Sequence, residues 1–245
     1  MAGAVNQTLK SKVDNLLGRA ALALWPPRCL ACGEPGGGGL DLCATCAAAL
    51  PLNRCACPCC AAPLALPAPA CGPCLRRPPP QQSARAVFLY RPPLDRWLPR
   101  AKFHGDLACV RLLAALMARE LADDQPLPQA LLPIPLHRAR LRQRGFDQAL
   151  ELARPLARHL GIALRADVLQ RVRATQAQTR LDAAARRRNL RGAFAVAPGH
   201  GLPPHVVLVD DVMTTGATVH AATRALLQAG VARVDVWACA RVPPA

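Results

Sequence analysis

The stretch VVLVDDVMTTGAT, residues 206–218, limits most strongly how this chain can fold. It opens with the apolar run Val206 to Val209, which lacks polar alternation and is typical of a strand covered on both faces of a parallel sheet. After the turn, apolar residues recur at helical spacing, at Val219, Ala222, Leu226 and Ala229. The order strand, turn, helix predicts an open α/β sheet, in which ligands bind beyond the carboxyl ends of the strands.

The turn joins two carboxylates to a hydroxyl-rich loop. Hydroxyls and backbone N–H groups gather at the helix N-terminus, where the dipole favours a phosphate, in Thr214, Thr215, Gly216 and Thr218. Asp210 and Asp211 would repel that phosphate, so we expect them to face a ribose diol or a divalent cation. A sugar phosphate satisfies both ends. Two simpler interpretations stay open: a magnesium site like that of receiver domains, and an acidic helix cap.

These residues resemble the phosphoribosyl pyrophosphate (PRPP) signature of type I phosphoribosyltransferases. The resemblance implies that the paired acids hold the ribose hydroxyls, that the threonine-glycine loop holds the 5′-phosphate, and that Mg²⁺ accompanies PRPP. The PRPP-binding residues implied are Asp210, Asp211, Val212, Met213, Thr214, Thr215, Gly216, Ala217 and Thr218. Purine-salvage relatives usually carry an aspartate at the first threonine position. Here the residue is Thr214, which argues against salvage of 6-oxopurines.

The cysteines follow a repeated spacing, Cys-x2-Cys-x10-Cys-x2-Cys. The first set is Cys29, Cys32, Cys43 and Cys46, and the second is Cys57, Cys60, Cys71 and Cys74. Eight thiolates suffice for two structural four-cysteine zinc sites, which would form the core of a segment with few large apolar residues. A disulfide network is the alternative. Cys55 and Cys59 leave the register of the second set ambiguous, and the choice made here follows the repeat.

Composition bears on location and partners. The formal net charge of +16 favours contact with polyanions at low salt. Charged residues interrupt any apolar run near the N-terminus, so we expect no secretory signal and a cytoplasmic, reducing location. No segment approaches the ~20 apolar residues of a membrane span, so we expect no transmembrane segment. Cys109 and Cys239 have no paired cysteine, and we expect both to be small core residues.

We expect three parts: a helical arm over 1–26, a double zinc ribbon over 27–77, and a phosphoribosyltransferase-like domain over 84–245, after a linker at 78–83. In the third part strands and helices alternate. The expected strands are 84–90, 130–134, 163–169, 206–209 and 234–241, and the expected helices include 107–121 and 146–160. The fold class predicted is α/β, a doubly wound parallel sheet of the type I phosphoribosyltransferase kind, with a small N-terminal cysteine-rich double zinc ribbon.

A second motif, LLPIPLHRARLRQRGFDQA at 131–149, supplies a candidate site for the pyrophosphate. A strand ends in proline, and Arg138, Arg140, Arg142 and Arg144 follow ahead of a helix that we expect to open near Gly145. One guanidinium group can bind a phosphate through two parallel hydrogen bonds, and it stays charged at any working pH. The residues we assign to this basic loop are His137, Arg138, Arg140 and Arg144. A solvated basic face is the alternative.

With the cysteine pairs in front, these motifs resemble the competence protein F family, also called DNA-utilisation phosphoribosyltransferase-like proteins. AKFHGD (101–106) is similar to that family's Lys-aromatic-x-Gly-Asp segment, and PLHRARLRQRGFDQA to its Arg-Gly-Phe-Asn-Gln block. TQAQTRLDAAARRRNLRGAF (175–194) is similar to its Thr-x2-Gln-x2-Leu…Arg-x-x-Asn segment. The chain departs at Asp147, where the family usually has Asn, and at Pro155, which we expect to break or kink its helix.

The polar segment after 174 has the composition of a mobile lid. In phosphoribosyltransferases a flexible loop closes over PRPP and shields the reaction from water. The flexible-loop residues that the resemblance implies are Thr175, Gln178, Arg187 and Asn189. A solvated arginine run is the alternative.

Three hypotheses follow, and no catalytic residue is assigned. We favour a DNA-uptake protein that binds PRPP and single-stranded DNA, with proteins of the DNA-uptake machinery as further partners, as the resemblance implies. The second is an active phosphoribosyltransferase, a PRPP-dependent glycosyltransferase acting on an unidentified base or nucleophile. No base pocket is recognisable in the sequence. The third is a PRPP-sensing regulator without turnover.

Overall fold

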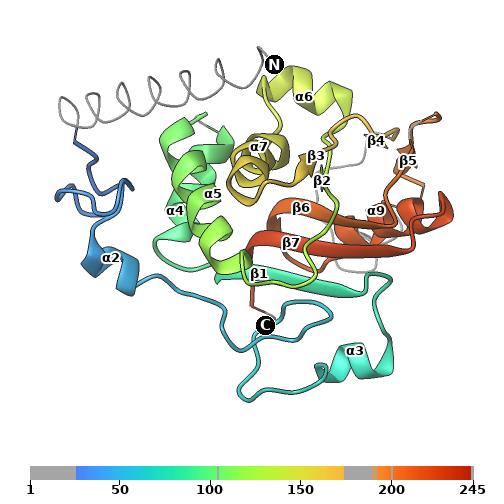
Figure 1. Cartoon of the computed structure of the whole chain (residues 1–245), viewed down its shortest axis with the longest axis horizontal. Helices are drawn as coiled ribbons and strands as arrows, with labels where there is room; N and C mark the ends of the chain where they lie inside the picture. The colour runs from blue at the N-terminus through green and yellow to red at the C-terminus, as the bar shows by residue number, and fades with distance from the viewer. Residues whose placement is uncertain (1–25, 104, 174–189, 191, 200, 244–245) are drawn as a thin grey trace, which may run out of the picture. The chain divides into compact units, whose positions relative to one another are not determined.

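The computed structural model describes residues 26–103, 105–173, 190, 192–199 and 201–243 (Figure 1). The chain packs as two units, Met1–Leu50 and Pro51–Ala245. The expected N-terminal arm lies outside the described residues except for its last position. In the described part of the first unit, the short helix α2 (Ala44–Ala48) contains Cys46 and is capped by Cys43, two members of the first cysteine set. No helix among the described residues has the length and apolar character that a membrane span requires.

The second unit contains the second cysteine set and an α/β domain. Its elements in chain order are α3 (Gly72–Arg76), β1 (Ser83–Leu89), α4 (Leu94–Phe103), α5 (Leu107–Leu121), β2 (Ala130–Pro133), α6 (Arg138–Arg144), α7 (Gln148–Leu160), β3 (Ala163–Leu164), β4 (Leu169–Arg171), β5 (Phe194–Val196), β6 (His205–Met213), α9 (Ala217–Gln228) and β7 (Arg233–Arg241).

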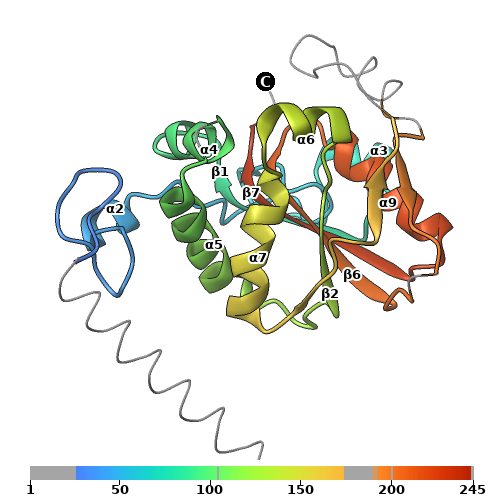
Figure 2. The same ribbon diagram turned by 90° about the horizontal axis from the view of Figure 1, so that it is seen from above.

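A parallel sheet forms the centre of this unit. Within the described residues its strand order is β1-β7-β6-β2-β3, and every neighbouring pair is parallel. Helix α9 and the β4–β5 hairpin pack on one face, against side chains such as Val206, Leu208 and Val236. Since successive side chains of a strand point to opposite faces, the intervening residues point toward α5 and α7 (Figures 1 and 2). The doubly wound parallel sheet predicted from the sequence is therefore confirmed.

Several local expectations need correction. The strand expected over 163–169 divides: β3 joins the main sheet, whereas β4 pairs antiparallel with β5. The run of arginines is itself the helix α6, which precedes the expected helix α7. Helix α7 also continues through Pro155. The ring is buried, so packing of this face offsets the loss of one backbone hydrogen bond.

The segment expected as a linker is tied to its neighbours. The Gln81 amide Nε2 donates to the carbonyl of Cys59 at 2.8 Å, and the Gln82 side chain accepts from the Val234 backbone N–H at 2.8 Å. Gln81 is 4% exposed. These contacts join the end of the cysteine-rich segment to the sheet, so the polar composition of this segment reflects buried hydrogen bonding. Cys109 and Cys239 are fully buried, as expected of core residues.

Candidate functional site

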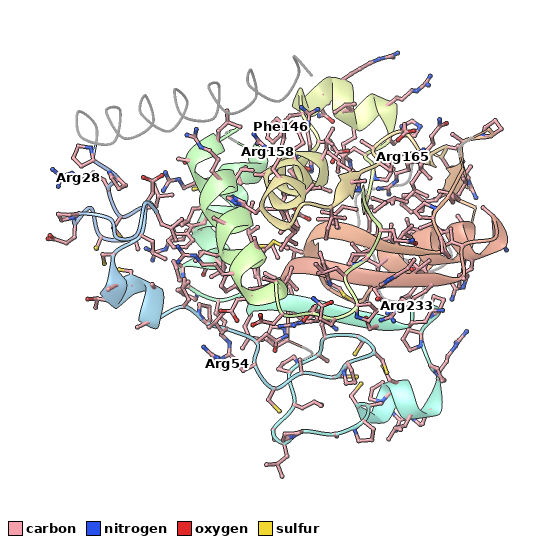
Figure 3. All side chains as sticks on the ribbon, in the orientation of Figure 1. Arg28, Arg54, Phe146, Arg158, Arg165 and Arg233 are labelled. Atoms are coloured by element: carbon pink, nitrogen blue, oxygen red, sulfur yellow. The ribbon has the colours of Figure 1, made fainter. Side chains whose placement is uncertain are left out.

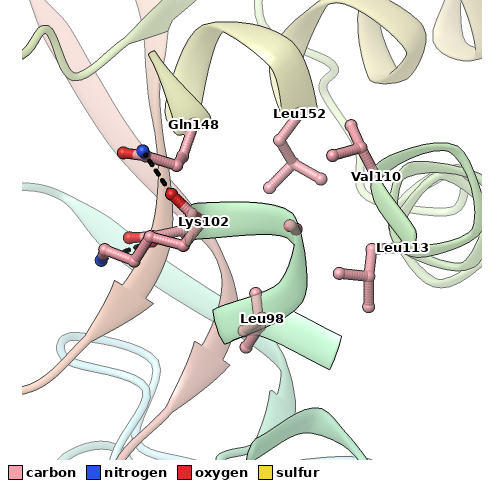
Figure 4. Close-up of a pocket in the computed structure, with 8 residues that line it drawn as sticks. Leu98, Lys102, Val110, Leu113, Gln148 and Leu152 are labelled. Atoms are coloured by element: carbon pink, nitrogen blue, oxygen red, sulfur yellow. Dashed lines mark hydrogen bonds and ion pairs between the residues drawn. The ribbon is translucent and has the colours of Figure 1, made fainter. Parts of the chain in front are cut away.

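Strand β6 carries the two carboxylates to the carboxyl edge of the sheet. The Asp211 backbone N–H donates to Asp210 Oδ1 at 2.9 Å, and the Val212 N–H donates to Asp211 Oδ1 at 2.8 Å. Asp211 Oδ2 accepts from Lys102 Nζ of α4 at 2.8 Å (Figure 4). Both carboxylates are thus oriented by hydrogen bonds, and one of them already has a cationic partner.

Asp210 resists ionisation in the folded protein. Burial raises the pKa of Asp210 well above its ordinary value, and the neighbouring charge of Asp211 raises it further. Lys102 acts in the opposite direction. Two adjacent carboxylates in a partly enclosed site resist carrying two charges, so a bound cation or a hydroxyl donor would relieve their repulsion.

The loop after β6 turns sharply into α9. Gly216 precedes the helix with φ +76°, a conformation that favours glycine. A Cβ atom there would lie 3.0 Å from both Met213 Cε and His220 Nε2, so the turn also needs the small residue. Thr215 Oγ1 accepts from the Ala217 N–H at 3.4 Å. The expected phosphate loop therefore lies where its N–H groups and hydroxyls meet the start of α9.

A cavity of about 610 Å³ opens beside these residues. The acids and part of the loop line it through Asp210, Asp211, Val212, Thr214 and Thr218. Of the predicted basic loop, Arg140 and Arg144 line the cavity. His137 instead caps α6, where its Nδ1 accepts from the Ala139 N–H at 3.3 Å. Arg138 is exposed and is not among the residues that line the cavity.

A chain of hydrogen bonds connects the basic wall to the acidic one. Arg144 Nη1 donates to Gln148 Oε1 at 3.2 Å. Gln148 Nε2 in turn donates to the carbonyl of Lys102 at 3.2 Å (Figure 4). Leu98, Val110 and Leu113 line the apolar side of a small adjoining pocket. Helices α4, α5 and α7 together therefore position the Lys102 ammonium group against the Asp211 carboxylate.

Three further charged residues line the cavity without having been assigned to it from sequence. Lys102 lies in the AKFHGD motif, and Arg171 ends β4. Burial, followed by the charge of Arg140, lowers the pKa of Arg171. Asp147 accepts from the backbone N–H of Leu136 at 2.8 Å and caps α7, and burial raises its pKa. The motif resemblance marked the segments of Lys102 and Asp147, whereas nothing local distinguished Arg171.

The predicted flexible-loop residues Thr175, Gln178, Arg187 and Asn189 lie outside the described residues.

The two cysteine sets form separate metal-binding centres. In each set the four Sγ atoms lie within 4.8 Å of one another. Cys32 and Cys43 Sγ are 3.7 Å apart, and Cys60 and Cys71 Sγ are 3.6 Å apart. A tetrahedron with Zn–S bonds of about 2.3 Å has edges of about 3.8 Å. Each set therefore fits zinc, and the second set has the register that the repeat predicts, without Cys55 or Cys59.

Thiol ionisation also favours a cation in these centres. Burial by itself would raise the pKa of Cys57, but N–H groups of Cys71, Cys59 and Cys60 lower it to about 6. In contrast, burial raises the pKa of Cys60 to about 11. Without a cation only part of the set would ionise at neutral pH, whereas a divalent metal allows all four thiolates to form.

Known protein families match the cysteine-rich part and the α/β part of the chain separately. Residues 20–75 match the double zinc ribbon domain, and residues 147–243 match the phosphoribosyl transferase domain. The fold and the two matches define the class: a double zinc ribbon followed by a phosphoribosyltransferase domain. The adenine phosphoribosyltransferase of Leishmania donovani is 17% identical, with a TM-score of 0.35, over 56% of this chain and 55% of that chain. A likeness of that size carries no argument about substrate.

Relatives that match over most of their length are more similar. The DNA utilization protein YhgH of Salmonella typhi is 40% identical over 207 residues, which cover 82% of this chain and 90% of that protein. Competence protein F of Haemophilus influenzae is 35% identical over 177 residues, covering 69% and 77%. The chain belongs to the family of these DNA utilization and competence F proteins.

The cysteine geometry makes a metal prediction. We expect two zinc ions per chain in the purified protein by elemental analysis, and one after Cys74→Ala, since a zinc site of three cysteines loses affinity. Cys55→Ala is the control, and we expect it to keep both ions because Cys55 lies outside either set. Fewer than one zinc per wild-type chain after gentle preparation would contradict the assignment.

Proposed function

We propose that the protein binds Mg-PRPP in the cavity at the carboxyl edge of the sheet. Asp210 and Asp211 would take the ribose diol, residues 214–218 the 5′-phosphate, and Arg140 with Arg144 the pyrophosphate. The observation that carries the proposal is that one cavity is lined by both acids, by Thr214 and Thr218, and by the inward arginines of α6. Of the four residues assigned to the basic loop from the sequence, we keep Arg140 and Arg144 as the proposed pyrophosphate ligands and no longer propose His137 and Arg138.

The charge of the cavity supports an anionic ligand. Four cationic side chains line it, Lys102, Arg140, Arg144 and Arg171. Its acids are Asp147, Asp210 and Asp211, and burial raises the pKa of the first two. Burial and then the charge of Arg140 lower the pKa of Arg144, which marks repulsion between neighbouring guanidinium groups. A polyanion would relieve that repulsion, and Mg²⁺ would balance the acids beside the ribose.

Asp210→Asn separates binding from stability. Each hydrogen bond to a charged group contributes about 1.5 to 3 kcal/mol, so we expect the dissociation constant of Mg-PRPP to rise about tenfold or more in calorimetry. Because the folded pKa of Asp210 lies above its unfolded value, its stability contribution falls as pH rises between the two. The amide removes that cost, so urea unfolding at pH 7 should show equal or greater stability. Unchanged affinity for Mg-PRPP would contradict the assignment of Asp210 to the ribose diol.

Turnover is a second candidate function. The cavity extends to apolar residues that the proposed PRPP contacts do not use, among them Tyr90, Leu98 and Val242. An apolar wall with one aromatic ring suits a planar acceptor base. This wall is the observation that favours a transferase over a PRPP sensor.

Pyrophosphate release tests turnover. With Mg-PRPP and a panel of heteroaromatic bases, we expect release above the rate without acceptor for at least one base. Tyr90→Ala should reduce that rate through a higher KM for the base, since it shortens the apolar wall. Binding of PRPP without release in any mixture would instead support the PRPP-sensing regulator.

We further propose that single-stranded DNA binds the exposed face of α6, in a cytoplasmic protein that works with other DNA-uptake proteins. The name of the Salmonella typhi relative, DNA utilization protein, points to DNA. Arg138 and Arg142 are exposed on the same helix whose other arginines line the cavity. Other arginines are exposed as well, such as Arg158 on α7, which is labelled in Figure 3. A sequence-independent contact to phosphates is what such a surface provides.

Two double variants on α6 separate the ligands. Arg138→Ala with Arg142→Ala should weaken DNA binding and reduce the salt slope by about 0.7 for each phosphate that the variant no longer neutralises, while the affinity for PRPP is kept. Arg140→Ala with Arg144→Ala should reverse that pattern. Fluorescence anisotropy with oligonucleotides over a salt series measures DNA binding, and calorimetry measures PRPP binding. DNA affinity that ignores salt and survives the first pair would rule out this face.

A further inference from the structure

Arg241 lies between the second cysteine set and the phosphate loop. It is the last residue of β7, and only 7% of it is exposed. Its Nε donates to the carbonyl of Cys60 at 3.1 Å. Its Nη1 donates to the carbonyls of Met213 at 3.1 Å and Val242 at 2.6 Å, and also to that of Thr214. One guanidinium group therefore holds a zinc-ribbon carbonyl and two carbonyls of the loop that follows the paired acids.

The charge of Arg241 needs a counter-charge. Among the described residues no carboxylate forms an ion pair with it. Its side chain contacts the second cysteine set directly, through the carbonyl of Cys60. Four thiolates around Zn²⁺ carry a net charge of about −2. With zinc bound, the second centre would therefore supply a counter-charge close to this buried cation.

The carbonyls that Arg241 holds determine the direction of the phosphate-loop N–H groups. The carbonyl of Thr214 and the N–H of Thr215 belong to one planar peptide and point in opposite directions. With the Thr214 oxygen held by Arg241, the Thr215 N–H points away from the guanidinium group. The carbonyl of Met213 also accepts from the Val242 N–H at 3.0 Å, so the start of the loop is fixed by two donors. N–H groups at this turn are the proposed ligands of the 5′-phosphate.

The second ribbon also contacts the sheet through its backbone. The Ala84 N–H donates to the carbonyl of Pro58 at 2.7 Å, and Asn53 N donates to the carbonyl of Val87 at 2.9 Å. A shift of residues 57–60 on metal loss would therefore reach both the edge strand β1 and Arg241.

We propose that Arg241 is a positioning residue through which the second zinc centre sets the conformation of the phosphate loop, so that metal in this centre raises the affinity for PRPP. The proposal rests on PRPP being the ligand of the cavity. The first centre lies within Met1–Leu50 and serves as the matched control, because it has the same four-cysteine chemistry.

Calorimetry with Mg-PRPP on full-length variants tests the coupling. Cys74→Ala removes a ligand of the second centre, and Cys46→Ala removes one of the first. We expect about a tenfold loss of affinity for Cys74→Ala and for Arg241→Gln, and less than a twofold change for Cys46→Ala. Arg241→Lys keeps the charge but can reach fewer carbonyls, so it should recover part of the loss. Equal affinities in all four variants would overturn the proposal.

Two readouts separate coupling from general destabilisation. By reciprocity, saturating PRPP should raise the zinc affinity of the second centre by the same factor, measured by chelator competition in Cys46→Ala. Hydrogen exchange of residues 213–218 without PRPP should accelerate in Arg241→Gln and not in Cys46→Ala. If wild-type protein binds no PRPP, the proposed ligand is wrong, and hydrogen exchange still decides the coupling. Unchanged exchange in Arg241→Gln would refute it even if Cys74→Ala fails to fold.

Discussion

The arrangement depends on one strand, β6, being held in parallel between β2 and β7. Residues 206–209 are fully buried, and both neighbours pair with them in register. Because all three strands run in the same direction, their carboxyl ends reach the same edge. Pro133 pairs beside Val209, and Met213 beside Arg241. The basic helix, the acidic pair with its loop, and Arg241 therefore converge, although they lie up to about a hundred residues apart in the chain.

This convergence brings like charges close together at the cavity, which costs free energy in the absence of a ligand. Asp210 is held partly enclosed beside a second carboxylate, and the arginines opposite repel one another. Such a site stores unfavourable electrostatic energy that a ligand of the right charge pattern releases. The Lys102 to Asp211 ion pair lowers this cost before a ligand arrives and orients the acid. Arg241 is a similar case, because its buried guanidinium group contacts the second cysteine set at the carbonyl of Cys60.

Much of the fold could be predicted because its signals are local. The apolar run at 206–209, the helical spacing after it and the two identical cysteine repeats each specify their own structure, so the sheet and both cysteine sets were predicted correctly. The division of 163–169 was not, since the pairing of β4 with β5 depends on a distant segment. Helix α7 likewise tolerates Pro155 because tertiary packing of its buried face outweighs local preference.

The site was only partly predictable for the same reason. Sequence placed four arginines in one motif, but the helical form of α6 decides that Arg140 and Arg144 face the cavity and Arg138 does not. Lys102 and Arg171 reach the cavity from other elements. Arg241 carried no local signal, because its partners at Cys60 and Met213 are 181 and 28 residues away.

A crystal structure of the protein grown with Mg-PRPP tests the central claim most directly. The account predicts the ribose diol against Asp210 and Asp211, the 5′-phosphate at residues 214–218, and the pyrophosphate beside Arg140 and Arg144. PRPP bound elsewhere on the protein, or an empty cavity at saturating PRPP, would contradict it.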